Sequence, residues 1–108
     1  MKQIHICGAK NAGGAELFYY RFVKELHKRN PENIVPIVKK NSWLSSQLTQ
    51  ANIPHKLANF GGFFDCSTRQ TIARIIEDYQ PDIVQAWMSR AAKFMPKTII
   101  PTFARLGG

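Results

Sequence analysis

The spacing of apolar and polar positions divides the chain into short alternating segments and longer helical ones. Residues 2–7 alternate polar and apolar side chains and then meet Gly8, a pattern typical of a first strand that runs into a turn. Residues 15–29 place apolar side chains at helical spacing, and Asn30-Pro31 ends that helix. The same patterns predict further strands at 34–38, 54–58, 83–87 and 98–103, and helices at 42–51, 67–79 and 89–95.

Strands and helices therefore alternate along the whole predicted chain. This order predicts one α/β domain, with a parallel sheet of about five strands and helices on both faces. Pro36 lacks an N–H, so we expect the second strand at a sheet edge or Pro36 at a strand end. Ser42 is expected to cap the second helix, and Ser67 or Asp65 the third.

The connection after the first strand is the most informative candidate for chemistry. In a parallel sheet, ligands bind at the carboxyl ends of the strands, where residues 8–14, 59–65, 88–90 and 104–108 are expected. Gly13 and Gly14 come just before the first long helix. Without side chains they would let phosphate approach the amide groups of the helix N-terminus. The alternative is that these glycines only make a tight turn.

Two sharper phosphate motifs fail in this connection. The dinucleotide pattern GxGxxG cannot be placed, since Ala9-Lys10 follow Gly8 and no third glycine falls in register. The P-loop pattern begins at Gly8 and Gly13, but Gly14-Ala15 stand where Lys and Ser or Thr are required. The sequence therefore argues against an ATPase or GTPase.

Composition adds a strongly basic charge. Lys and Arg total 15 and Asp and Glu total 7, a formal net charge of +8. Such a field attracts phosphate in nucleic acid, anionic lipid or a nucleotide-sugar, and charge alone does not choose among them. Two cysteines without a CxxC or a Cys/His cluster argue against a disulfide framework and a zinc site. Without a signal peptide or a long apolar run, a cytoplasmic protein is expected.

Other polar residues are predicted near the same edge of the sheet. Glu16, in the first helical turn, either stabilises the helix dipole or fixes the glycine loop. Ser89 is expected to cap a helix, while Arg90 and Arg105 are candidates for anion contact. For Arg90 a solvated position is the alternative. The predicted cleft or acceptor-binding residues are Glu16, Ser89, Arg90, Arg105 and Gly107; no nucleophile–base pair emerges, so catalytic residues stay unassigned.

Aromatic and imidazole side chains are open to two interpretations. Trp87 ends the fourth predicted strand, where it either stacks on a sugar or lies in the core, and the core is favoured. The aromatic residues around Gly61-Gly62 either form a wall over an acceptor or pack beneath their loop, and packing is favoured. These residues are Phe60, Phe63 and Phe64. A structural role is expected for each histidine, namely His5, His27 and His55.

Three segments together resemble family 4 ("group 1") glycosyltransferases. Asn11-Ala12-Gly13-Gly14-Ala15-Glu16, followed by an amphipathic helix, resembles the opening of these enzymes. The run from Pro81 to Ala91, PDIVQAWMSRA, is similar to their fourth-strand segment. Ala104-Arg105-Leu106-Gly107-Gly108 is similar to the ARLGG stretch of bacterial members, several of which build lipopolysaccharide or other surface glycans.

The resemblance implies a fold and a role for this chain. Such enzymes have the GT-B architecture, in which two Rossmann-like domains face a cleft, and this chain would be the N-terminal, acceptor-side domain. Transfer from the nucleotide-sugar retains anomeric configuration and usually needs no metal, so no cofactor is expected. Carried over by position, Gly13 and Gly14 would contact the donor phosphate, while Arg90 and Arg105 would line the cleft. Peripheral contact with an anionic membrane would suit a lipid-linked acceptor.

The sequence also departs from the family pattern. Gln85 and Trp87 stand where many members have His, and the donor-binding half with its paired Glu motif is absent. The chain ends on Gly107-Gly108 directly after a strand, so we expect a truncated domain that is inactive alone and able to self-associate through an exposed sheet edge. The rival hypothesis is a small basic α/β module that binds nucleic acid or a phosphorylated ligand. The absence of a nucleic-acid motif argues against a nucleic-acid partner.

Overall fold

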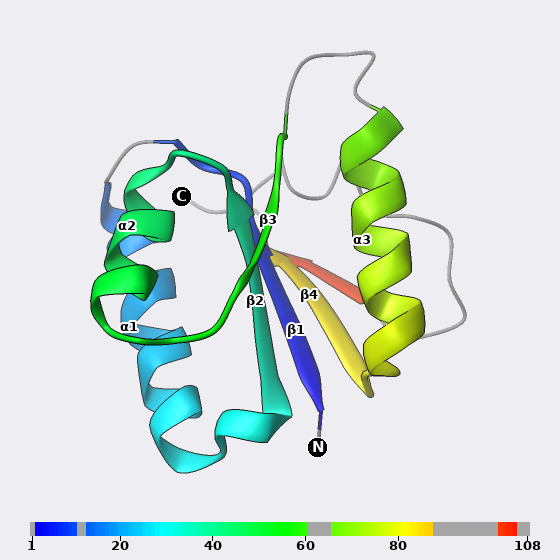
Figure 1. Cartoon of the computed structure of the whole chain (residues 1–108). Coiled ribbons are helices and arrows are strands. Elements are labelled where there is room, and N and C mark those ends of the chain that lie inside the picture. The colour runs from blue at the N-terminus through cyan, green and yellow to red at the C-terminus, as the bar shows by residue number, and fades with distance from the viewer. Residues whose placement is uncertain (1, 11–12, 61–65, 88–101, 106–108) are drawn as a thin grey trace.

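The protein is a layered α/β domain whose elements follow one another in the expected order (Figure 1). The structure, a computed structural model, describes residues 2–10, 13–60, 66–87 and 102–105. The strands are β1 (Gln3–Cys7), β2 (Ile34–Lys39), β3 (Lys56–Ala58), β4 (Ile83–Trp87) and β5 (Thr102–Arg105). The helices are α1 (Gly14–Arg29), α2 (Trp43–Gln50) and α3 (Cys66–Tyr79), with a short 3-10 turn η1 (Pro31–Asn33).

The strands form one sheet in the order β3-β2-β1-β4-β5, and every neighbouring pair is parallel. In register, Cys7 of β1 lies beside Val38 of β2 and Trp87 of β4, and Trp87 lies beside Arg105 of β5. The carboxyl ends of these strands therefore share one edge. Helices α1 and α2 cover one face and α3 the other (Figure 1). The prediction of a parallel α/β sheet with helices on both faces is confirmed.

Alternation along the strands divides the core into two layers. Ile4 and Ile6 of β1 pack with Ile72 and Ile76 of α3 on one face of the sheet. Cys7, one residue out of phase with Ile6, packs on the opposite face. Its neighbours there come mainly from α1, α2 and the adjoining strands and include Tyr19, Val23, Val38, Leu44, Leu48 and Trp87. A period of two in the strands thus supplies both helical layers.

The second helix forms where its cap signal predicted. The Ser42 hydroxyl accepts a hydrogen bond from the Ser45 N–H at 3.1 Å and donates one to the Lys39 carbonyl at 2.6 Å. The third helix begins at Cys66, the residue after Asp65 and before Ser67. Ser67 is thus its second residue rather than its cap, and the alternative cap Asp65 lies outside the described residues.

The expected edge position of the second strand is wrong. β2 lies between β3 and β1, with Pro36 in its interior beside His5 of β1. However, β3 pairs only with Ile37–Lys39. On the β3 side, therefore, no strand of the described sheet lies beside Pro36, and its missing N–H costs no hydrogen bond between strands on that side.

Two other strand boundaries differ from the prediction. β3 begins at Lys56, two residues after the expected Pro54, and β5 runs from Thr102 to Arg105 rather than ending at Phe103. Arg105 therefore ends a strand instead of following it. The helix predicted at 89–95 and the start of the predicted fifth strand, 98–101, lie outside the described residues.

Candidate functional site

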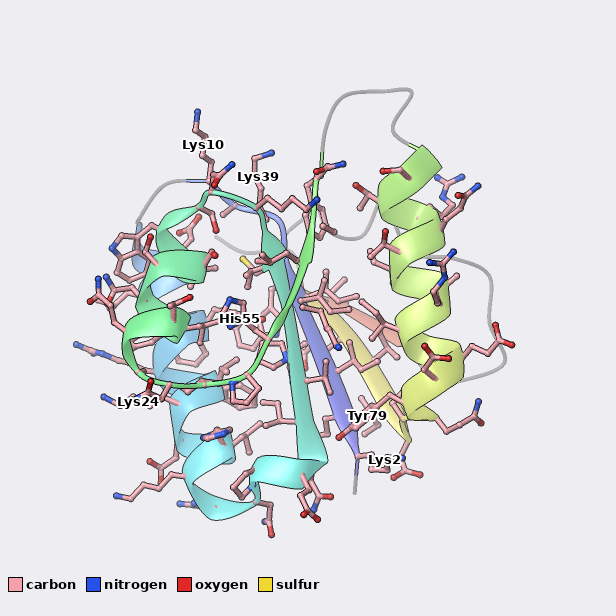
Figure 2. All side chains as sticks on the ribbon, viewed as in Figure 1. Lys2, Lys10, Lys24, Lys39, His55 and Tyr79 are labelled. Atoms are coloured by element: carbon pink, nitrogen blue, oxygen red, sulfur yellow. The ribbon has the colours of Figure 1, made fainter. Side chains whose placement is uncertain are left out.

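The connections that follow β1, β2 and β3 meet at the carboxyl edge of the sheet. The Trp43 N–H donates to the Lys10 carbonyl at 3.0 Å, which joins the β1–α1 connection to the start of α2. The Lys40 N–H donates to the Ala58 carbonyl at 2.9 Å and joins β2 to the end of β3. Lys10 and Lys39 project from this end of the molecule, whereas Lys2 and Tyr79 lie at the other end (Figure 2). The carboxyl edge therefore carries lysine side chains, and hydrogen bonds hold its connections together.

The N-terminus of α1 opens onto this edge without a side-chain cap. Gly13 is the N-cap residue, and no side chain makes a cap hydrogen bond there within the described residues. The first helical hydrogen bond runs from the Leu17 N–H to the Gly13 carbonyl at 3.0 Å. The amides of Gly14, Ala15 and Glu16 precede it and have no helical acceptor. With the positive end of the helix dipole, they form a site suited to an anion.

The backbone does not explain why glycine stands at positions 13 and 14. Gly13 is extended, with φ −161° and ψ −176°, and no described glycine has a positive φ. A Cβ built on Gly14 would meet nothing within 4 Å, so no neighbour requires its absence either. Both the tight turn and the phosphate contact therefore stay predictions for these glycines. Within the described residues, glycine leaves open space at Gly14 next to amide groups that have no helical acceptor.

Glu16 lies on the protein side of this loop. Its side chain is buried and folds back toward Gly13, where a Cβ would lie 2.8 Å from the Glu16 Oε2. Burial chiefly, with a smaller contribution from the Glu16 charge, raises the pKa of Cys7 to about 11. Cys7 is therefore a protonated core thiol at neutral pH. The position of Glu16 suits both of its expected roles, which are to hold the glycine loop and to stabilise the helix dipole.

Trp87 and His5 form a buried pair beneath the edge. The Trp87 Nε1–H donates to the His5 Nδ1 at 3.1 Å, and the His5 Nε2 lies 2.8 Å from the Gln3 Oε1. Because indole nitrogen only donates, this pairing places the imidazole proton on Nε2. Burial lowers the pKa of His5 to about 4. The core position of Trp87 is confirmed, as is the structural role expected for His5.

The structure brings only some of the predicted site residues together. Gly13, Gly14 and Glu16 share the start of α1 at the carboxyl edge. Arg105 ends β5, separated from β1 by β4, so its backbone also reaches this edge. The Arg105 side chain lies outside the described residues, as do all of Ser89, Arg90 and Gly107. Their roles stay predictions.

Lys39 is not among the residues that the sequence predicts for the site, and the sequence leaves two interpretations open for Phe60. Both residues make contacts at the carboxyl edge. The Lys39 Nζ donates to the Asn59 carbonyl at 2.6 Å and so ties the end of β2 to the segment after β3. Phe60, in that segment, is buried, which confirms the packing interpretation for this residue. Phe63 and Phe64 lie outside the described residues. A lysine directly after an apolar strand, at the edge where ligands bind, was the available signal for Lys39.

Comparison with known proteins relates the chain to one class of enzyme. No protein-family model matches the chain. Over 96 residues, or 89% of this chain, it is 30% identical to the lipopolysaccharide core biosynthesis glycosyltransferase LpsD of Rhizobium meliloti (strain 1021). The chain spans 28% of the length of that relative. The similarity supports a relationship to a glycosyltransferase.

The described residues contain neither a membrane-spanning helix nor a cluster of metal ligands. Among the described residues, none of the helices combines the length and apolar character needed to cross a bilayer. In the same part of the chain, no three His, Cys, Asp or Glu side chains gather as a set of metal ligands.

Proposed function

We propose that this chain is the N-terminal, acceptor-side domain of a retaining GT-B glycosyltransferase. The enzyme would transfer a sugar from a nucleotide-sugar to a glycan or lipid-linked acceptor in the synthesis of lipopolysaccharide or another surface polysaccharide. The similarity to a lipopolysaccharide core glycosyltransferase supports this proposal. So does the parallel α/β fold, whose carboxyl edge is the place where such folds bind nucleotides.

The open space at Gly14 carries the proposal for the donor. Gly13 and Gly14 would offer their amides to the donor diphosphate, and the α1 dipole would favour its charge. The nucleotide-sugar is a substrate here, so the proposal includes no cofactor and no metal. The buried Glu16 side chain would hold the glycine loop in place through its contact with Gly13. Ser89, Arg90, Arg105 and Gly107 would line the acceptor cleft.

Substitution of Gly14 by alanine tests this assignment. Since the new methyl group meets no protein atom within 4 Å, the fold should tolerate Gly14→Ala and gain up to about 1 kcal/mol from helix propensity. A diphosphate that approaches the amides would meet the methyl group. We expect about tenfold weaker binding of UDP- or GDP-sugars by calorimetric titration, a loss of about 1.4 kcal/mol.

The control is Ser46→Ala, at an exposed position of α2. It also favours its helix, but it adds no methyl group at the start of α1, so affinity should not change. Equal binding by Gly14→Ala and the unsubstituted chain would refute the phosphate site. If no nucleotide-sugar binds at any concentration tested, the proposed donor contact is wrong.

The net charge of +8 also favours the rival hypothesis of a basic binding module. Phosphates of nucleic acid or of a phosphorylated ligand would then meet the same lysine-rich edge. The two hypotheses differ in their response to salt and to ligand. A salt-dependent shift on RNA without any response to UDP- or GDP-sugars would favour the binding module.

The outer face of α1 supports a proposal of peripheral membrane contact. Leu17 and Phe18 expose 39% and 49% of their surface near the start of the helix. Arg21, Lys24 and Lys28 follow at helical spacing and are exposed. Apolar side chains beside a basic stripe suit an interface with anionic lipid, where a lipid-linked acceptor would be found.

Self-association through a sheet edge stays a prediction. β3 is the outermost strand on one side of the sheet; it is three residues long and exposes Lys56 and Leu57. A short edge strand that carries a lysine pairs poorly with a second chain. Light scattering over a range of concentrations would detect the dimer if this edge exchanges strands.

A further inference from the structure

Phe60, the second residue after β3, has an unusual backbone conformation. Phe60 has a φ of 45°, in the left-handed region. The other described non-glycine residues with positive φ are Asn41, Asn52 and Gln80. Asparagine adopts this region readily, whereas a bulky aromatic residue rarely does. Such a conformation persists only where its surroundings over-determine it.

Two neighbouring elements hold the Phe60 backbone in place. The Phe60 N–H donates to the Thr68 Oγ1 at 2.8 Å, and both residues are buried. The Lys39 Nζ lies 2.6 Å from the Asn59 carbonyl oxygen and 3.5 Å from that of Phe60. Thr68 belongs to the first turn of α3, and Lys39 ends β2. Contacts from both sides of the segment therefore fix its strained turn.

The ring of Phe60 is pressed against Gly8, the first residue of the β1–α1 connection. A Cβ built on Gly8 would lie 2.7 Å from the Phe60 Cδ1 and 3.0 Å from its Cγ. Side chains cannot approach that closely, and Gly8 has no positive φ that would otherwise require glycine. The ring thus explains the glycine. It also sets where the chain leaves β1 on its way to Gly13 and Gly14.

We propose that Phe60 is a positioning residue for the anion-binding loop. Its strained backbone, held by Thr68 and Lys39, seats the ring on Gly8 and fixes the start of the connection that ends at the free amides of α1. Loose support would spread those amides over several positions and weaken contact with a diphosphate. This inference rests on the proposed function for the site at Gly14, while the packing of Phe60 on Gly8 does not.

Substitution on each side of the contact tests the inference. Phe60→Leu keeps an apolar side chain but removes the ring, and Gly8→Ala introduces the clash. We expect both to speed amide hydrogen exchange at residues 8–10 and to weaken binding of inorganic pyrophosphate about tenfold. In the double variant the shorter, flexible leucine can yield to the new methyl group, so part of the affinity lost in Gly8→Ala should return.

The control separates positioning from general loss of stability. Ile76→Val removes one methyl group from the same core layer, on α3. It should lower the melting temperature but leave pyrophosphate affinity and exchange at residues 8–10 unchanged. Unchanged exchange in Phe60→Leu would overturn the inference, as would affinity that falls equally in Ile76→Val. If pyrophosphate binds no variant, including the unsubstituted chain, the site at Gly14 fails, and exchange at residues 8–10 still decides the role of Phe60.

Discussion

At the scale of single residues, His5 shows how burial changes the pKa of a side chain. Its imidazole accepts from the Trp87 indole and is 1% exposed, and burial lowers its pKa from 6.5 to about 4. Protonation would place a charge inside the layer beneath α1 and break the bond to Trp87. His5 therefore serves as a neutral link between β1 and β4, and proton transfer in catalysis is a poor fit for it.

The titration of His5 predicts a loss of stability in acid. The unfolded chain takes up a proton near pH 6.5, whereas the folded chain takes one up only near pH 4. The free energy of unfolding is therefore highest above pH 6.5, where His5 is neutral in both states. It falls by an amount on the order of 3 kcal/mol as the pH drops from 6.5 to 4. The free energy of unfolding, measured with urea at each pH, should decrease from pH 6.5 to pH 4 in the unsubstituted chain. His5→Gln should remove this decrease, and the control His27→Gln should retain it. An equal decrease in His5→Gln would contradict this assignment.

At the scale of elements, two helices begin at the carboxyl edge with different N-termini. Within the described residues, α2 has the Ser42 hydroxyl as a cap, whereas α1 has Gly13 as its N-cap residue and no side-chain cap. The amides at the start of α1 therefore lack the side-chain acceptor that the start of α2 has, which suits the proposed contact with an anion. The contrast favours α1 over α2 as the helix that contacts ligand.

The capped helix gives a prediction of its own. Ser42→Ala removes a hydroxyl that bonds to both the Ser45 N–H and the Lys39 carbonyl, so stability should fall by about 1 kcal/mol. Thermal unfolding measures the loss. Ser46→Ala, one turn later on the exposed side, should be neutral or slightly stabilising. Equal stability of the two variants would show that the cap contributes nothing.

At the scale of the whole molecule, the position of the charge matters more than its sum. The basic stripe of α1 and the exposed Leu17 and Phe18 lie on the helix that starts at the glycine pair. Figure 2 shows Lys24 projecting away from the sheet on this side. A membrane bound along α1 would therefore bring a lipid-linked acceptor close to the carboxyl edge.

Charge reversal on α1 tests this orientation. Arg21→Glu with Lys28→Glu should weaken binding to vesicles that contain phosphatidylglycerol by about tenfold or more, because each basic residue near such a surface adds about 1 kcal/mol. Lys56→Glu with Arg74→Glu makes the same change in net charge on β3 and α3 and should bind as the unsubstituted chain does. Co-sedimentation measures both. Equal losses from the two pairs would mean that net charge, rather than the α1 face, drives binding.

Local signals in the sequence determined the elements and several of their ends. The alternation in β1, the spacing in α1 and the Ser42 cap depend on residues close together in the chain, so neighbouring side chains decide them. The glycine pair at the start of α1 was visible for the same reason. Pro36 misled because β2 is an interior strand that pairs with β1 at this residue, although β3 pairs only with Ile37–Lys39.

Tertiary structure alone decided the contacts that support the site. His5 and Trp87 are 82 residues apart in sequence, and they meet because β1 and β4 pair in register. Phe60 reaches Gly8 because β3, β2 and β1 lie side by side. Such contacts depend on how packed elements bring distant residues together, and no short window of sequence carries that information. The sequence therefore predicted a glycine pair at the start of α1, whereas only the packed structure placed Phe60 against Gly8 and Trp87 against His5.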